Sequence, residues 1–195
     1  MSHRVFIVHG WYGSPHKDWI PWLKSELEAR GFEVYAPEMP NPDKPNIAEW
    51  VHMLKRGVGK PDRNTFFVGH SIGCQTILRF LETLGEGEEI GGAVLVAPWL
   101  HLNTAAYRSQ SRMDIAAPWQ ETPIGWAKVL SHTKNFSAIF SDNDPYVPIA
   151  DSKIFKEKLG ADIIIENEKG HMAEGSGVFK LDRILSELLK IVEKT

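Results

Sequence analysis

The sequence has few of the features that mark secreted or membrane-spanning proteins. It contains a single cysteine, Cys74, so no disulfide can form within the chain. Its longest strongly apolar run, residues 91–100, is about half the length that a membrane-spanning helix requires. The N-terminal segment lacks the long apolar stretch and the cleavage site of a signal peptide. We therefore expect a protein of the reducing cytoplasm that does not bind membranes.

The chain also lacks an excess of charge of either sign. Its net charge is −3 and its pI is about 6.2, and basic and acidic residues are mixed along the chain. Nucleic acids and anionic membranes bind clustered basic faces, so neither is expected as the main partner. The length of 195 residues, 43% of them hydrophobic, suits one domain that spans residues 1–195 around a sizeable core.

Motifs that hold metals and phosphates are missing. The sequence contains no HExxH motif and no cluster of cysteine and histidine at ligand spacing, so we expect no metal ion. It contains neither GxxxxGK[ST] nor GxGxxG, which argues against a nucleotide or dinucleotide cofactor. The chemistry is therefore expected to rest on side chains alone.

Short apolar runs alternate with amphipathic segments along the chain. The runs predicted to be strands are residues 4–9, 32–36, 64–69, 93–97, 136–140 and 162–165. The segments predicted to be helices are residues 18–30, 47–58, 72–85, 149–159 and 178–193. This order indicates a three-layer α/β fold, with a mainly parallel sheet of about six strands and helices on both faces. Residues 99–134 break the alternation, and we expect a short helical insert there.

One serine lies at a junction where the pattern changes from strand to helix. Ser71 stands in FFVGHSIGC, flanked by Gly69 and Gly73. The Gly-x-Ser-x-Gly pattern also occurs by chance, and the alternative is a tight turn without a catalytic role. A strand before it and a helix after it are, however, what a nucleophile elbow requires. We therefore predict that Ser71 is a nucleophile and that the N–H of Ile72, at the start of the helix, stabilises an oxyanion.

A serine nucleophile needs a base, and the base needs an acid that orients it. Asp142 and Asp144 follow the fifth predicted strand, and His171 follows the sixth. The order Ser71, Asp144, His171 is the chain order of the α/β-hydrolases. Asp142 remains an alternative, because two side chains two residues apart point the same way in an extended stretch. We favour Asp144, because Pro145 biases it toward an extended conformation that aims its side chain off the strand end.

A second oxyanion donor is expected after the first strand, in the segment GWYG. We choose the backbone N–H of Trp11, with that of Tyr12 second. The alternative is a glycine-rich turn that only leads into the next helix. Aromatic and apolar residues near these loops suggest an apolar pocket for the acyl or alcohol group. The expected pocket residues are Tyr12, Trp99, Trp119 and Met172.

Several segments outside these positions support a family resemblance. They are FIVHGWYGS, WIPWLK, MPNP, FFVGHSIGC with ILRFLE, GGAVLVAP, SDNDPYVP and KGHMAEG. Together they resemble, nearly end to end, the small single-domain serine hydrolases that include bacterial YdeN-like proteins and a human retinoblastoma-binding protein. The resemblance implies an α/β-hydrolase fold with a minimal cap. It also implies that Ser71 is the nucleophile, Asp144 the acid and His171 the base.

Two functions are consistent with the sequence. The first is a serine hydrolase that cleaves a small carboxylic ester, thioester or amide, so the expected partner is a small-molecule acyl substrate. The second is a non-catalytic protein-binding module on a hydrolase scaffold, because a fold does not by itself define a function. No protein partner can be read from the sequence. A decayed enzyme is expected to lose a member of its triad, and none is lost here, which favours the enzyme.

Overall fold

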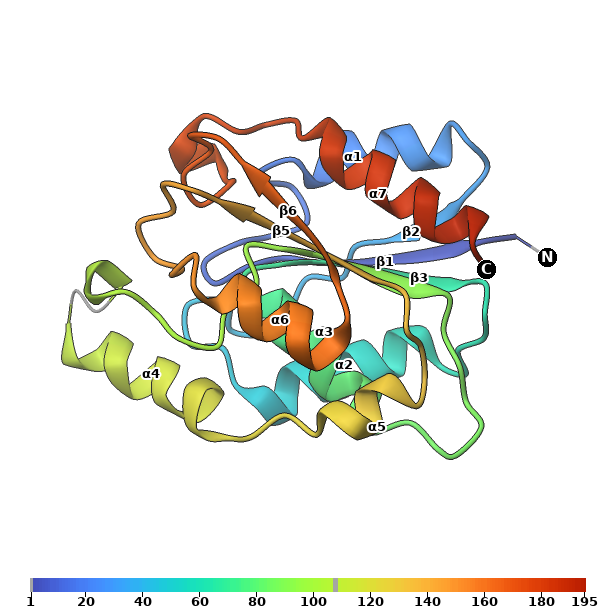
Figure 1. Cartoon of the computed structure of the whole chain (residues 1–195), viewed down its shortest axis with the longest axis horizontal. Helices are drawn as coiled ribbons and strands as arrows, with labels where there is room; N and C mark the ends of the chain where they lie inside the picture. Colours follow the sequence, from blue (N-terminus) through green and yellow to red (C-terminus); the bar gives the residue numbers. More distant parts are fainter. Residues whose placement is uncertain (1, 107–108) are drawn as a thin grey trace.

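In the part of the chain that the structure describes, residues 2–106 and 109–195, six parallel strands form one sheet (Figure 1). In this computed structural model the strands are β1 (Arg4–Val8), β2 (Glu33–Tyr35), β3 (Thr65–His70), β4 (Gly92–Val96), β5 (Phe136–Ser141) and β6 (Asp162–Glu166). Their order across the sheet is β2-β1-β3-β4-β5-β6. The predicted mainly parallel sheet is confirmed.

The central strands are buried along their whole length. Every residue of β3, β4 and β5 is buried, because helices cover both faces of the sheet. β6 also has an apolar centre of three isoleucines, but it lies at the edge of the sheet and is only partly buried. An apolar run therefore predicts a strand here, while its position in the sheet decides how far it is buried.

Helices form the two outer layers. They are α1 (Ile20–Glu28), α2 (Ile47–Val58), α3 (Ile72–Glu82), α4 (Gln110–Glu121), α5 (Trp126–Leu130), α6 (Asp151–Leu159) and α7 (Asp182–Glu193), with short 3-10 turns η1 (Thr104–Ala106) and η2 (Glu174–Ser176). Helices α1 and α7 cover one face of the sheet, and α2, α3, α5 and α6 cover the other (Figure 1). The predicted three-layer α/β fold is confirmed. Among the described residues, no helix combines the length and hydrophobicity needed to cross a bilayer.

The helix boundaries show where local sequence signals suffice and where they do not. Helix α2 spans the predicted residues, and Asn46 Oδ1 caps it by accepting the N–H groups of Ala48 at 2.9 Å and Glu49 at 3.2 Å. The predicted start of the last helix at residue 178 is wrong, because α7 begins only at Asp182. Val178 is buried although it lies in the preceding loop. Val178 therefore matches the apolar spacing of the last helix, although its own backbone is not helical.

The span between β4 and β5 contains η1, α4 and α5 and lies partly at the end of the sheet where the strands terminate (Figure 1). Its start is held by Asp151, whose Oδ2 accepts the N–H of Leu100 at 2.6 Å and that of His101 at 2.9 Å. The Asp151 side chain is only 2% exposed. This buried carboxylate fixes the segment that carries Trp99 over the carboxyl ends of the strands.

Candidate active site

Ser71 lies at the bend between β3 and α3 in a strained backbone conformation. Its φ of 53° and ψ of −118° fall in a region that L-residues rarely adopt. Its N–H donates a 2.8 Å hydrogen bond to the carbonyl oxygen of Val96, the last residue of β4. A strained serine on a sharp strand-to-helix turn is the geometry of a nucleophile elbow.

The glycines around Ser71 are required by close backbone packing. A Cβ added at Gly69 would lie 2.8 Å from the backbone nitrogen of Cys74. A Cβ added at Gly73 would overlap the carbonyl oxygen of Val8. The start of α3 therefore approaches β1 so closely that only glycine fits there.

Cys74, the other nucleophilic side chain near the bend, is fully buried. Its Sγ lies 3.4 Å from the carbonyl oxygen of Val96, to which it donates. Burial raises the pKa of the thiol far above its usual range, so the thiolate does not form at neutral pH. Cys74 is therefore not a candidate nucleophile.

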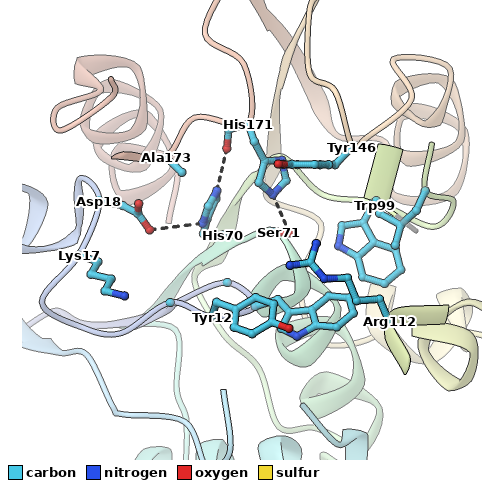
Figure 2. Close-up of a pocket in the computed structure, with 15 residues that line it drawn as sticks. Tyr12, Lys17, Asp18, His70, Ser71, Trp99, Arg112, Tyr146, His171 and Ala173 are labelled. Atoms are coloured by element: carbon cyan, nitrogen blue, oxygen red, sulfur yellow. Dashed lines mark hydrogen bonds and ion pairs between the residues drawn. The ribbon is translucent and has the colours of Figure 1, made fainter. Parts of the chain in front are cut away.

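His171 joins Ser71 to Asp144 through two hydrogen bonds. Its Nε2 lies 3.0 Å from Ser71 Oγ (Figure 2), and its Nδ1 lies 2.8 Å from Asp144 Oδ2. The other carboxylate oxygen of Asp144 accepts the backbone N–H of Tyr146 at 2.8 Å and that of Val147 at 3.1 Å. The side chain of Asp144 is 2% exposed and that of His171 is 16% exposed. The three functional groups thus form one continuous, largely buried hydrogen-bonded chain.

The alternative aspartate, Asp142, has a different partner. Its Oδ1 accepts the backbone N–H of Glu168 at 2.8 Å, and the neighbouring Asn143 Oδ1 accepts that of Gly170 at 2.7 Å. These bonds join the loop after β5 to the loop after β6, which carries His171. The structure thus brings Asp144, and not Asp142, to the imidazole.

A second histidine, His70, is hydrogen-bonded to the backbone of His171. His70 Nε2 donates a 2.9 Å hydrogen bond to the carbonyl oxygen of His171 (Figure 2). Burial, and then repulsion from His171, lowers the pKa of His70 to about 4, so the ring is neutral at neutral pH. The 3.9 Å approach of its Nδ1 to Asp18 is therefore not an ion pair. His70 acts as a neutral donor that positions the backbone of the His171 loop.

The backbone N–H groups of Trp11 and Ile72, the two predicted oxyanion donors, have no protein acceptor within the described residues. The Tyr12 N–H, the second choice from the sequence, donates to the carbonyl oxygen of Pro42 at 2.7 Å and is therefore occupied. The Trp11 indole donates to the carbonyl oxygen of Asp43 at 3.0 Å, which fixes the loop. The Trp11 N–H, in a residue that lines the cavity at Ser71, and the Ile72 N–H, at the start of α3, are therefore unoccupied donors.

A cavity of about 250 Å³ opens at Ser71 (Figure 2). Tyr12 and Trp99 line it, as the sequence predicts, together with Leu102 and Tyr146. The Tyr146 ring packs edge-on against the His171 ring at 5.2 Å between centroids. The cavity therefore has mainly apolar walls around the serine and histidine.

Two expected pocket residues lie elsewhere, and these predictions are wrong. Trp119 is 2% exposed, and its indole donates to the carbonyl oxygen of Pro45 at 3.1 Å and packs edge-on against Trp50. Met172 is fully buried, and its carbonyl oxygen accepts the indole N–H of Trp19 at 3.0 Å. Both side chains belong to the core, because closeness to the site in sequence does not decide the direction of a side chain.

The sequence reasoning missed the charged residues of the cavity, Lys17, Asp18 and Arg112. Arg112 comes from α4, within the weakly periodic insert, so no sequence signal indicated its position. Asp18 and Lys17 follow the GWYG segment and could have been suspected from it. Within the described residues, no group of histidine, cysteine, aspartate and glutamate side chains is arranged to hold a metal ion.

The parallel sheet, the elbow after β3 and the histidine after β6 define an α/β-hydrolase. A family model described as serine hydrolase matches residues 5–190, and the chain belongs to that family. It is 29% identical to YdeN of Bacillus subtilis (strain 168) over 194 residues, which cover 100% of this chain and 98% of YdeN. It is 23% identical to serine hydrolase RBBP9 of Rattus norvegicus over 183 residues, 93% of this chain and 88% of RBBP9.

Solved structures agree with this assignment. The crystal structure of B. subtilis YdeN superposes with a TM-score of 0.88, covering 98% of this chain and 100% of that chain. A structure from the study of the metagenome-derived lipolytic enzymes LipS and LipT superposes with a TM-score of 0.72 at 14% identity, covering 98% and 94%. The second likeness shows a shared fold only.

Proposed function

We propose that the protein cleaves a small carboxylic ester, thioester or amide through an acyl-enzyme formed on Ser71. The observation that carries the proposal is the hydrogen-bonded chain from Ser71 Oγ through His171 to Asp144, with links of 3.0 Å and 2.8 Å. A serine hydroxyl is a weak nucleophile at neutral pH and needs such a base. The cavity of about 250 Å³ lies below the usual range of ligand pockets, which favours a small substrate.

The proton of Ser71 Oγ is transferred in two steps. His171 Nε2 accepts the Ser71 proton as Oγ attacks the acyl carbon, and then gives it to the leaving group. Asp144 accepts the Nδ1–H bond, which sets the imidazole tautomer and stabilises the imidazolium. A water activated by His171 then hydrolyses the acyl-enzyme and restores Ser71.

The oxyanion that forms during attack would bind to the N–H groups of Ile72 and Trp11. Both groups are without a protein acceptor among the described residues. Ile72 is also the first residue of α3, where the helix dipole favours negative charge. Donors held in place before the reaction are typically worth about 10²–10³ in kcat each.

Known relatives support hydrolysis, and the finer chemistry is part of the proposal. The chain belongs to the serine hydrolase family, and lipolytic enzymes share its fold. A protein-binding module would need neither the hydrogen-bonded chain nor unoccupied donors beside it. Acyl transfer therefore accounts for more of the site than binding alone.

Labelling with a fluorophosphonate probe tests the proposal directly. The wild-type protein should be labelled at Ser71 alone, and Ser71→Ala should lose labelling and lower kcat on 4-nitrophenyl esters by about 10³–10⁶-fold. Ser25→Ala, an exposed serine on α1 outside the cavity, serves as the matched control and should label fully. Undiminished labelling of the Ser71→Ala protein would reject Ser71 as the nucleophile. A series of esters of increasing chain length then defines the acyl preference.

A further inference from the structure

Arg112 lies in the cavity beside Ser71 and is not explained by the proposed hydrolysis alone. Figure 2 shows its side chain directed from α4 into the cavity. The guanidinium carbon lies 5.2 Å from the centre of the Tyr12 ring. Arginine binds favourably over aromatic faces, so Tyr12 holds the guanidinium in place.

The guanidinium of Arg112 has no hydrogen bond or ion pair among residues 2–106 and 109–195. Arginines on the exposed surface gain less from pairing, and several of them nevertheless have carboxylate partners. Three of them pair with glutamates, Arg30 with Glu26 at 2.7 Å, Arg63 with Glu89 at 2.6 Å and Arg183 with Glu166 at 3.2 Å. A half-buried arginine that faces a cavity and has no carboxylate partner is ready to bind an anion.

The rest of the cavity lining offsets this charge only in part. Lys17 is a second cation in the lining, and no ion pair joins it to any described residue. Asp18 is the one carboxylate of the described lining, and its Oδ1 already accepts the N–H of Glu174 at 2.8 Å. The described lining therefore carries two cations and one carboxylate, an excess of positive charge in a chain whose net charge is −3.

We propose that Arg112 binds a carboxylate at the non-reacting end of the substrate, which makes it a specificity-determining residue. This inference rests on the proposed function, because it places the reacting carbonyl at Ser71. The planar guanidinium matches a carboxylate with two parallel hydrogen bonds. The apolar walls formed by Trp99 and Leu102 suit the methylene groups between the two ends. The substrate class is then a monoester, monothioester or monoamide of a short dicarboxylic acid.

Two matched esters test this inference. Mono-4-nitrophenyl adipate and 4-nitrophenyl hexanoate have the same number of carbon atoms in the acyl chain, and only the first ends in a carboxylate. The quantity measured is the carboxylate preference, defined as kcat/KM on the adipate ester divided by kcat/KM on the hexanoate ester after subtraction of spontaneous hydrolysis. We expect a preference well above one in the wild-type protein, falling as salt concentration rises because salt screens the charge.

Substitution of the arginine should remove this preference. Arg112→Met keeps the length of the side chain but not the charge, and should lower the carboxylate preference by about 10- to 100-fold, the usual effect of losing a charge-assisted hydrogen bond. Arg56→Met, on the exposed side of α2 and outside the cavity, removes the same charge and should keep the preference. A wild-type preference of one or less, or an unchanged preference in Arg112→Met, would overturn the inference.

A binding measurement separates this inference from the proposed function. In the Ser71→Ala protein, ligand-observed NMR compares monomethyl adipate with methyl hexanoate, so no catalysis is needed. The inference predicts tighter binding of monomethyl adipate, lost when Arg112→Met is added. Equal binding of the two esters would contradict the role of Arg112 even if Ser71 is the nucleophile. Tighter, Arg112-dependent binding would support that role even if the wild-type protein cleaves neither ester.

Discussion

The carboxylate of Asp144 accepts a 2.8 Å hydrogen bond from Nδ1 of His171. Asp142, two residues earlier, instead accepts the backbone N–H of Glu168. The two aspartates therefore have separable tasks, one in setting the imidazole and the other in joining two loops. Substitution of each aspartate should therefore have a different effect.

Asp144→Asn should lower kcat by about 10²–10⁴-fold while the fold survives, because the amide presents the wrong partner to the imidazole and mis-sets its tautomer, as in the well-studied serine proteases. Asp142→Asn keeps an oxygen acceptor for the N–H of Glu168 and should lose little activity and about 1 kcal/mol of stability at most. Steady-state kinetics on a 4-nitrophenyl ester, with thermal melting of both variants, checks the pair. The reverse ranking at equal thermal stability would assign the acid to Asp142.

Substitution by alanine should have opposite effects on stability at Gly73 and at Gly57. Gly73→Ala places a Cβ against the carbonyl oxygen of Val8 and should cost about 3 kcal/mol or more, because backbone cannot move aside as a side chain can. Gly57, within α2, has no atom within 4 Å of an added Cβ, and Gly57→Ala should stabilise the protein by about 0.5–1 kcal/mol through helix propensity. Urea unfolding measures both. Equal stability of the two variants would contradict the close packing of α3 on β1.

His70 should make the protein less stable as the pH falls. Its pKa is lowered to about 4 in the folded state by burial and by His171, against an ordinary value of 6.5. Below pH 6.5 the unfolded chain binds a proton that the folded protein accepts only near pH 4, so the free energy of unfolding falls across this range. The full effect is on the order of 3 kcal/mol.

His70→Gln should reduce this pH dependence, because the amide can still donate to the carbonyl oxygen of His171 but does not titrate. His9 keeps part of the dependence, since burial lowers its pKa as well. His52→Gln, on the exposed side of α2, is the matched control and should behave as the wild-type protein does. Urea unfolding between pH 4 and pH 7 is the measurement. If the free energy of unfolding varied with pH to the same extent in the wild-type and His70→Gln proteins, His70 would not stay neutral in the folded state.

Asp151 should anchor the start of the insert. Asp151→Ala leaves the part-buried N–H groups of Leu100 and His101 without their acceptor and should cost about 1–3 kcal/mol. It should also release the adjacent Trp99 and change its fluorescence. Asp182→Ala removes an exposed aspartate from the first turn of α7 and should cost less than about 1 kcal/mol. Equal losses from the two variants would show that the anchor contributes nothing specific.

Features that depend on neighbouring residues could be predicted from the sequence alone. Alternating apolar and amphipathic segments predicted the layered parallel sheet, because the spacing of apolar residues reflects which side of each strand or helix faces the core. Asn46 predicted the start of α2, because a cap acts within one helical turn. Gly69 and Gly73 around Ser71 predicted a sharp bend between strand and helix, because glycine there is a local steric requirement.

Contacts between groups that are distant in sequence depend on how the whole chain folds. Pro145 favoured Asp144 over Asp142 in the sequence but left both open, and the hydrogen bonds between the loops after β5 and β6 bring only Asp144 to His171. Met172 follows His171 directly and yet lies in the core, whereas Arg112 comes from a segment without clear periodicity and lies in the cavity. The direction of a side chain in a loop depends on how that loop packs on elements far away in sequence. A local sequence pattern does not predict those contacts.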